Sequence, residues 1–357
     1  MIQSEKKKKM IGLIGILIAS AGIAAGAFFS WKKQPEPVTK DIFALDTFCT
    51  ITLYAGSCDL QEAADHAADV LRNYDTLFDA NREGSDIRNI NHRSDAVSTG
   101  SDVQPVSQVR ISQETGHMLS MAKEMEIFTG GALWPGIRPL TELWDIKNRT
   151  TVPQKDQVEE ALANSRNASW EICGAEYPAE KDTAPEAEMS AAFFAAGNEE
   201  TKIEVGAFAK GYIADRIKEE LVRSGVTSAI IDLGGNVQTV GQKTDGEPFR
   251  VGIRDPEGMK SYVEIVEADD ISVVTAGTYQ RYFEAEGKKY HHIIDPETGM
   301  PSESGLVSVT VWGPSSFVCD CLATASVVLG KEKAEDMIRR YNEVNHAEYE
   351  LYCIEEK

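Results

Sequence analysis

Asp320 and Thr324 are the two oxygen-bearing side chains in the middle of a small and apolar stretch, SSFVCDCLATASVVLG. Their spacing places both on one face of a helix, so they can point at one spot. A carboxylate and a hydroxyl are both oxygen ligands, which suit a hard cation such as Mg²⁺. The alternative is structural: Asp320 caps a neighbouring loop, and Thr324 bonds back into its own helix. Either way, a buried carboxylate needs a partner.

Three further stretches carry residues that could bind an anion or move a proton. In VGAFAKGYIADR a glycine precedes a helix, whose free N–H groups attract phosphate, and Lys210 adds a positive charge; many helices begin in this way. In DLGGNVQTVG, Gly234 and Gly235 allow a ligand or another backbone to approach closely, or simply form a turn. In YHHIIDPETGMP only one of His291 and His292 can face inward along a strand, as a base, a phosphate contact or a structural histidine.

The composition excludes one class of partner. The 357 residues have a formal net charge of −21, which argues against a nucleic-acid-binding protein, and the hydrophobic fraction of 42% is that of a globular chain with a core. An acidic protein that binds an anionic ligand must do so with a local device, such as a metal, a helix N-terminus or a placed cation. The six cysteines fit no zinc-binding spacing, so we expect mostly small buried hydrophobic residues.

The N-terminal region predicts attachment to a membrane. A basic segment, residues 1–9, precedes an apolar segment, residues 10–30, that contains 19 consecutive residues without a charge. A helix of that length spans the hydrocarbon core of a bilayer, and the lysines favour the cytoplasmic side. The apolar segment is either an uncleaved anchor or a signal peptide cut after Ala25–Ala27. We therefore expect a single-pass cell-membrane protein, or a secreted one if the segment is cleaved, with the rest of the chain outside.

Residues 31–41 are expected to form a linker, and residues 42–357 one folded domain. Helical periodicity concentrates in the first part of this domain and strands in the second, which is typical of an α+β fold with mixed helices and largely antiparallel sheets. Residues 175–201 predict a variable loop or a strand pair. The expected helices cover residues 59–80, 112–128, 152–164, 206–225, 315–330 and 331–342. Apolar residues at helical spacing are Ala63, Ala67, Val70, Tyr74 and Leu77 in the first of these and Ala214, Ile217 and Leu221 in the fourth. The expected strands cover residues 48–55, 226–233, 248–255, 262–268, 271–275, 281–295 (with a hairpin turn at EGKK) and 306–313, with a last strand after the final helix.

Eight motifs in order resemble those of the ApbE family, the FAD:protein FMN transferases, over roughly residues 42 to 330. They are LDTFCTITLY, SDIRNIN, GGALWPGIRPLTELW, VGAFAKGYIADR, LGGNVQTVG, VTAGTYQRYF, HHIIDPETGMP and CDCLATA. The resemblance implies that FAD is split at its pyrophosphate, that FMN is joined through phosphate to a Thr or Ser of a target flavoprotein, and that AMP leaves, with Mg²⁺ required. It also implies an acceptor that is a subunit of a redox membrane complex or an exported reductase.

The resemblance also implies roles for individual residues. Asp320, Thr324 and the backbone carbonyl of Ala207 match the metal ligands. His292 matches the histidine before the D-P-x-T-G turn and is assigned to catalysis, where Asp295 would orient it or stabilise the turn. The positions that match FAD contacts are Leu45, Asn81, Ala132, Leu133, Trp134, Glu204, Lys210 and Ile294.

Three positions depart from the family's usual pattern. Trp134 replaces an aspartate that would contact FAD, although an indole could stack on the ligand. Glu204 stands where aspartate is common, and Ala276 where serine is frequent. Two alternatives to a transferase therefore remain. The first is a Mg²⁺-dependent FAD pyrophosphatase, in which water and not a protein hydroxyl attacks the pyrophosphate of FAD. The second is a non-catalytic extracytoplasmic FAD-binding protein, which the presence of Trp134 in place of aspartate favours.

Overall fold

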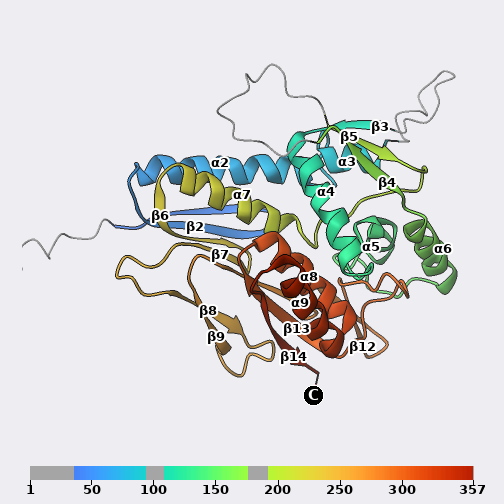
Figure 1. Ribbon diagram of the computed structural model, residues 1–357. Coiled ribbons are helices and arrows are strands. Elements are labelled where there is room, and N and C mark those ends of the chain that lie inside the picture. The colour runs from blue at the N-terminus through green and yellow to red at the C-terminus, as the bar shows by residue number, and fades with distance from the viewer. Residues whose placement is uncertain (1–35, 94–107, 176–191, 357) are drawn as a thin grey trace, which may run out of the picture. The chain divides into compact units, whose positions relative to one another are not determined.

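The computed structural model describes residues 36–93, 108–175 and 192–356 (Figure 1). The predicted basic segment 1–9, the apolar segment 10–30 and residues 31–35 of the predicted linker lie outside the described residues. Within the described residues, no helix has the length and hydrophobicity needed to cross a membrane. Residues 38–41, predicted as part of the linker, instead belong to the first strand, β1 (Val38–Ala44), because they pair with the next strand along the chain. This strand opens the compact unit Val38–Lys357.

A seven-stranded antiparallel sheet is the centre of this unit. Alternation of buried and exposed residues defines its strands: in β2, Cys49, Ile51 and Leu53 are all 0% exposed and lie on one face. All neighbouring strands pair antiparallel, which confirms the predicted α+β class. The order across the sheet is β1, β2 (Thr47–Gly56), β6 (Val226–Leu233), β7 (Asn236–Val240), β10 (Ser272–Gly277), β13 (Leu306–Gly313) and β14 (Glu350–Glu355).

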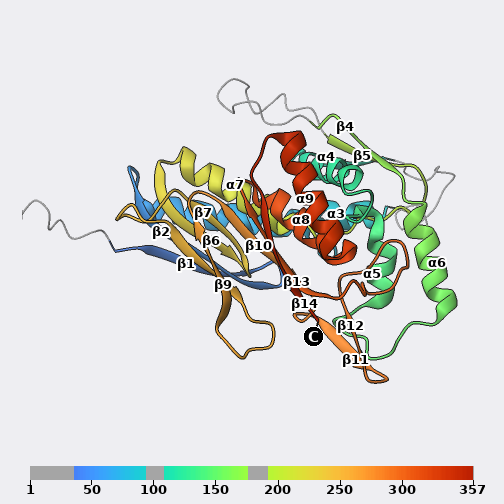
Figure 2. The same cartoon turned by 60° about the horizontal axis from the view of Figure 1, so that its bottom comes forward.

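The two faces of the sheet are covered differently (Figures 1 and 2). Four helices pack on one face: α2 (Leu60–Phe78), α7 (Ala209–Arg223), α8 (Ser316–Leu329) and α9 (Lys331–Asn345). The hairpin of β8 (Phe249–Arg254) and β9 (Tyr262–Ala268) packs on the other face, where Phe249 and Val266 meet Tyr54, Ile230 and Trp312. The helix-covered face therefore holds the main core, and the predicted metal pair on α8 lies on this side.

The helical stripes confirm the predictions in part. In α7 the predicted stripe of Ala214, Ile217 and Leu221 is at most 1% exposed. The stripe predicted for α2 included Val70 and Leu77, which are only half-buried, because α2 packs against both the sheet and α7 and so buries a wider face. Its buried residues are Ala63, Ala64, Ala67, Ala68, Leu71, Tyr74 and Phe78.

The smaller elements flank this core. Of the region 175–201, residues 176–191 lie outside the described residues. The described part contains β5 (Ala192–Ala196), which pairs with β3 (Gln108–Ile111) and β4 (Trp170–Cys173), both outside the region, so the alternative of a loop or a strand pair stays a prediction. The EGKK hairpin is confirmed by the pairing of β11 (Tyr282–Ala285) with β12 (Lys288–His291). The remaining elements are α3 (Asp86–Asn91), α4 (Gln113–Phe128), η2 (Pro135–Ile137), α5 (Arg138–Trp144) and α6 (Lys155–Arg166).

The cysteines form no disulfide among the described residues. Cys49, Cys319 and Cys321 are buried, as expected of small hydrophobic residues. Cys58 and Cys353 are half-buried and Cys173 is exposed, so the expectation of burial holds for only part of the set.

Candidate functional site

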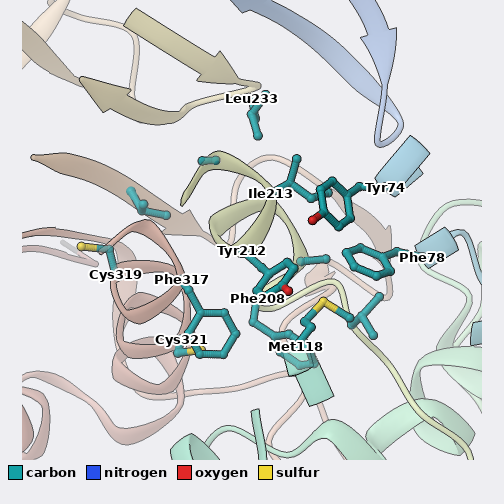
Figure 3. Packing of buried hydrophobic residues seen from close by; sticks show 14 of the residues in the cluster. Tyr74, Phe78, Met118, Phe208, Tyr212, Ile213, Leu233, Phe317, Cys319 and Cys321 are labelled. Atoms are coloured by element: carbon teal, nitrogen blue, oxygen red, sulfur yellow. The ribbon is translucent and has the colours of Figure 1, made fainter. Parts of the chain in front are cut away.

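The start of α7 lies directly against the start of α8. A Cβ added to Gly211 would lie 2.4 Å from the carbonyl oxygen of Ser316 and 2.7 Å from the Cα of Phe317, so only glycine permits this approach. Phe208 and Tyr212 of the α7 region meet Phe317 edge-on, with ring centroids 6.0 and 6.3 Å apart (Figure 3). The aromatic packing and the missing side chain together hold the two helix ends in contact.

Asp320 lies at this junction and is 4% exposed. Its Oδ2 accepts a hydrogen bond of 2.9 Å from the backbone N–H of Gly211, and its Oδ1 lies 3.9 Å from the Nζ of Lys210. Burial raises the pKa of the Asp320 carboxyl, while the charge of Lys210, the Gly211 amide and the side chain of Asn236 act in the opposite direction. The carboxylate therefore has partners, as the sequence required, but its lone pairs are not all used.

The hydrogen bond from Gly211 changes what is free at the start of α7. Gly211 is the third residue of α7, so its N–H is one of the groups at a helix start that have no partner within the helix, and here it donates to Asp320. Among the described residues nothing donates to the Ala207 carbonyl, and the Thr324 hydroxyl makes no hydrogen bond, so Thr324 does not back-bond into its own helix. A carboxylate, a carbonyl and a hydroxyl thus keep unused oxygen lone pairs, which is the donor set that Mg²⁺ favours.

Asp215 is a residue that the sequence analysis missed. Its carboxylate, on α7, accepts hydrogen bonds from the Ser315 hydroxyl at 2.7 Å and from the backbone N–H groups of Ser316 and Phe317 at 2.8 and 2.9 Å. Burial raises the pKa of Asp215 despite these bonds. It caps α8, the helix that carries Asp320 and Thr324. An acidic residue within the apolar stripe of AKGYIADR was the signal that could have identified it.

The two adjacent histidines differ in function. His291 uses both ring nitrogens: Nε2 donates to the carbonyl of Ser302 at 2.9 Å, and Nδ1 accepts from the N–H of Ile293 at 3.3 Å. In His292, Nδ1 lies 3.3 Å from the carbonyl of Arg281, which can only accept, so Nδ1 carries the proton and Nε2 keeps its lone pair. Burial, together with nearby positive charges that include Lys210, lowers the pKa of His292 to about 4. At neutral pH His292 is therefore an uncharged base.

The turn after His292 and the turn after β6 resolve two open alternatives. The carboxylate of Asp295 accepts from the N–H of Glu297 at 2.8 Å and from the hydroxyl of Thr298 at 3.0 Å, so Asp295 stabilises the turn. Gly234 has φ of 69°, and a Cβ there would lie 2.4 Å from Oγ1 of Thr47, so this glycine permits close approach of the β1–β2 hairpin.

Leu45 and Asn81 both lie near the C-terminal end of α2. Leu45 is in the β1–β2 turn with φ of 55°, a left-handed conformation that is rare for leucine, and its N–H donates to Oδ1 of Asp75 at 2.8 Å. Asn81 is exposed just after α2, where its N–H donates to Oδ1 of Asp79 at 2.8 Å. Both positions present backbone or side-chain polar groups at the surface.

The residues around η2 are held by their neighbours. Leu133 is 2% exposed and Ala132 packs beside it, so contact of Leu133 with a ligand would have to come from its backbone. The indole N–H of Trp134 donates to the carbonyl of Ser165 on α6 at 3.1 Å, so its polar end is already used within the protein.

Glu204 and Ile294 also have defined structural roles. One oxygen of Glu204 accepts from Arg138 at 2.9 Å and from Thr141 at 3.0 Å, while the other accepts from the N–H of Gly206 at 3.0 Å. The longer glutamate therefore ties the segment before α7 to α5. Ile294 is 4% exposed in a second hydrophobic cluster, beside Trp144.

The structure thus brings together part of the predicted site. Lys210 and Asp320 meet at the α7–α8 junction, and Glu204 accepts a hydrogen bond from Gly206 just before α7; Ala207 precedes the same helix, and Thr324 lies one turn after Asp320 on α8. Across the described residues no hydrogen bond or ion pair joins the other predicted FAD contacts to this junction. Within the same residues no group of three or more His, Cys, Asp or Glu side chains could hold a metal, so any cation here would depend on the mixed oxygen set.

Two surface hollows lie elsewhere. One of about 410 Å³ is lined by α5 and α6 with Glu200 and Lys202, and another of about 620 Å³ lies along the β8–β9 hairpin. Neither is lined by a predicted site residue. We therefore base the candidate site on the chemistry of the α7–α8 junction.

The sequence of the chain is similar to that of known proteins. The sequence model of the ApbE family matches residues 45–347. A curated FAD:protein FMN transferase of Treponema pallidum is 28% identical over 343 residues, which cover 93% of this chain and 88% of the relative. One from Klebsiella pneumoniae is 31% identical over 278 residues, covering 77% of this chain and 78% of the relative.

Solved structures share the fold. A crystal structure of the ApbE protein from Thermotoga maritima has a TM-score of 0.73 at 23% identity, covering 90% of this chain and 97% of that chain. The flavin transferase ApbE from Vibrio cholerae has a TM-score of 0.71 at 23% identity, covering 89% of this chain and 97% of that chain. At this identity the likeness concerns the fold alone.

Proposed function

The chain belongs to the ApbE family, and on that basis we propose that it is an enzyme that transfers FMN from FAD to a protein. In the finer form of the proposal, a Thr or Ser hydroxyl of the acceptor attacks the FMN phosphorus of FAD, the pyrophosphate bond breaks, and AMP leaves. The observation that carries the proposal is the α7–α8 junction, where a buried carboxylate, a lysine and a helix N-terminus meet in an otherwise acidic chain.

Asp320, Thr324 and the Ala207 carbonyl would hold the Mg²⁺ ion that the proposal includes. The fit is supported by the nearly buried carboxylate and by the carbonyl of Ala207, to which nothing donates among the described residues. When bound, the ion supplies neutralisation of the negative charge that a pyrophosphate concentrates and that shifts to the leaving AMP.

Lys210 and the start of α7 support the binding of an anion. Lys210 is the second residue of α7, its side chain is 31% exposed, and it is paired with Asp320 only at 3.9 Å. Its charge can therefore reach a phosphate oxygen while it stays near the carboxylate. The positive end of the helix dipole acts in the same direction.

His292 is proposed as the base that accepts the proton of the acceptor hydroxyl. Its neutral state at pH 7 and the free lone pair of Nε2 support this role. The Arg281 carbonyl holds the ring in the tautomer that leaves Nε2 unprotonated.

The acceptor and the location of the protein are part of the proposal. We expect the acceptor to be a flavoprotein, either a subunit of a redox membrane complex or an exported reductase, because the family resemblance implies such targets. We expect the chain to be anchored by residues 10–30 with the catalytic part outside the cell, or secreted after cleavage. This rests on the charge and hydropathy of the N-terminal sequence.

One experiment separates this function from its alternatives. The full-length chain is incubated with FAD, Mg²⁺ and a candidate exported flavoprotein, and the acceptor is weighed by mass spectrometry. A gain of one FMN supports transfer, whereas FMN and AMP without an adduct would indicate a pyrophosphatase, and unchanged FAD on the protein a carrier. Asp320→Ala is the matched variant: full activity of this variant at saturating Mg²⁺ would refute the proposed metal role.

A further inference from the structure

Asn236 is the first residue of β7 and is 1% exposed. It directly follows the Gly234–Gly235 turn, and its backbone pairs with Val274 of β10. Its side-chain Oδ1 accepts a hydrogen bond of 2.7 Å from the hydroxyl of Ser316, at the start of α8. The side chain is therefore held between the sheet and the helix that carries the candidate metal ligands.

The other end of the same amide has no regular partner. Within the described residues the buried Nδ2 of Asn236 makes no hydrogen bond of good geometry. A buried N–H group without an acceptor is costly, so its retention needs a reason. Ser316 and Asp320 lie four residues apart on α8 and therefore on the same face of the helix, so the amide bonded to Ser316 lies on the side of α8 that carries the Asp320 carboxylate.

The orientation of the amide follows from its surroundings. If the amide were reversed, Oδ1 would face the carboxylate of Asp320, and two acceptors would oppose each other without a proton between them. Ser316 is itself held in place, because its N–H donates to Oδ1 of Asp215 at 2.8 Å. Hydrogen bonds therefore run from Asp215 through Ser316 to Asn236, and they hold the amide on the face of α8 that carries Asp320.

We propose that Asn236 is a positioning residue that orients the Asp320 carboxylate for binding of a divalent cation. The Gly211 amide donates to one oxygen of this carboxylate from the α7 side, and on the sheet side the same task would fall to the buried Nδ2 of Asn236, which has no other partner among the described residues. The remaining lone pairs then point in one direction, toward the cation. This inference rests on the proposed function, since it concerns the same site.

The test measures metal affinity apart from turnover. The full-length chain and Asn236→Ala are titrated with Mn²⁺ in the presence of saturating ADP, which carries a diphosphate but no flavin, and free Mn²⁺ is followed by electron paramagnetic resonance. Loss of a group that orients a metal ligand typically weakens binding about 10- to 100-fold, and we expect a rise of that size in the Kd of Asn236→Ala. With FAD as substrate, the Mg²⁺ concentration for half-maximal rate should rise in parallel.

Gln238→Ala is the matched control. Gln238 lies two residues further along β7 on the same face, is 0% exposed, and also has an unpartnered amide atom, but its Nε2 donates to the Thr239 carbonyl. We expect its Mn²⁺ Kd to stay within about twofold of the unaltered chain, although both variants lose stability. Ser316→Ala should raise the Kd less than Asn236→Ala, and the double variant should add little, because both act on one contact.

The possible results distinguish a failure of the Asn236 proposal from a failure of the proposed FMN transfer. If Asn236→Ala binds Mn²⁺ like the unaltered chain while its unfolding free energy falls as in Gln238→Ala, Asn236 is merely structural and the inference is overturned. If the unaltered chain transfers FMN in that case, the proposed function still stands. If the unaltered chain neither binds Mn²⁺ nor transfers FMN, the proposed function fails, and the inference fails with it.

Discussion

Asp215 should stabilise both the fold and the site, and its replacement by alanine tests this directly. The change removes the acceptor of three hydrogen bonds, two from backbone N–H groups and one from a hydroxyl, at the first turn of α8. Each unsatisfied buried donor costs about 1–3 kcal/mol, but water can reach part of this site, so we expect a total loss of about 2–4 kcal/mol in the free energy of unfolding.

Asp59→Ala is the appropriate control, because Asp59 also caps a helix. Its carboxylate accepts from the N–H groups of Gln61 and Glu62 at the exposed start of α2, away from the candidate site. Loss of such a cap costs about 0.5–2 kcal/mol. Asp59→Ala should therefore be mildly destabilised and keep its rate of FMN transfer, whereas Asp215→Ala should lose both stability and transfer.

Urea unfolding, followed by tryptophan fluorescence, gives the free energy of unfolding for each variant. The transfer rate is measured at a temperature where both variants are folded, so that loss of folded protein does not account for loss of rate. An ordinary surface substitution changes the free energy of unfolding by no more than about 0.5 kcal/mol. If Asp215→Ala differs from the unaltered chain by no more than this, water replaces the hydrogen bonds of Asp215. Unchanged transfer would show that α8 keeps its position without Asp215.

Further predictions concern the junction, the base and the pH dependence. Gly211→Ala should cost about 1–3 kcal/mol, because its Cβ would overlap the start of α8, and calorimetry would contradict this by showing an unchanged Tm. His292→Gln should lower kcat for transfer about 10²- to 10⁴-fold with FAD affinity retained, and an unchanged kcat would exclude His292 as the base. Burial lowers the pKa of His117 and of His292 to about 4 from an ordinary 6.5, so the unfolded chain binds more protons between these values. The contribution of these histidines to the free energy of unfolding should therefore be fully present above about pH 6.5 and fall as the pH is lowered toward about 4. In His117→Gln the urea midpoint should fall less over this pH range than in the unaltered chain, and an equal fall in both proteins would refute the assignment.

Local patterns predicted most of the elements correctly. The α7 stripe and the β11–β12 hairpin follow from periodicity and from turn chemistry, both of which depend on residues close in the chain. The pattern was less reliable for α2, where Val70 and Leu77 are only half-buried. A helix that contacts two neighbours buries a face that a single apolar stripe does not describe.

The candidate site was predicted in part for the same reason. Asp320 and Thr324 were found because four residues apart on a helix is a local relation. Asp215 and Asn236 were missed because each acts on α8 from a different element, and neither residue type by itself indicates a cap or a positioning group.

The sequence alone determined that Asp320 and Thr324 share one helix face and that eight motifs stand in the order of one family; the helix predicted to start directly after Gly206 begins at Ala209. Only the tertiary structure decided that the free Gly211 amide at the start of α7 bonds to Asp320, 109 residues away. It also decided that Asp215 caps a helix 101 residues further along. The physical reason is that helical and strand periodicity act over a few residues, whereas these contacts depend on the order of the strands and on how closely two helices can approach.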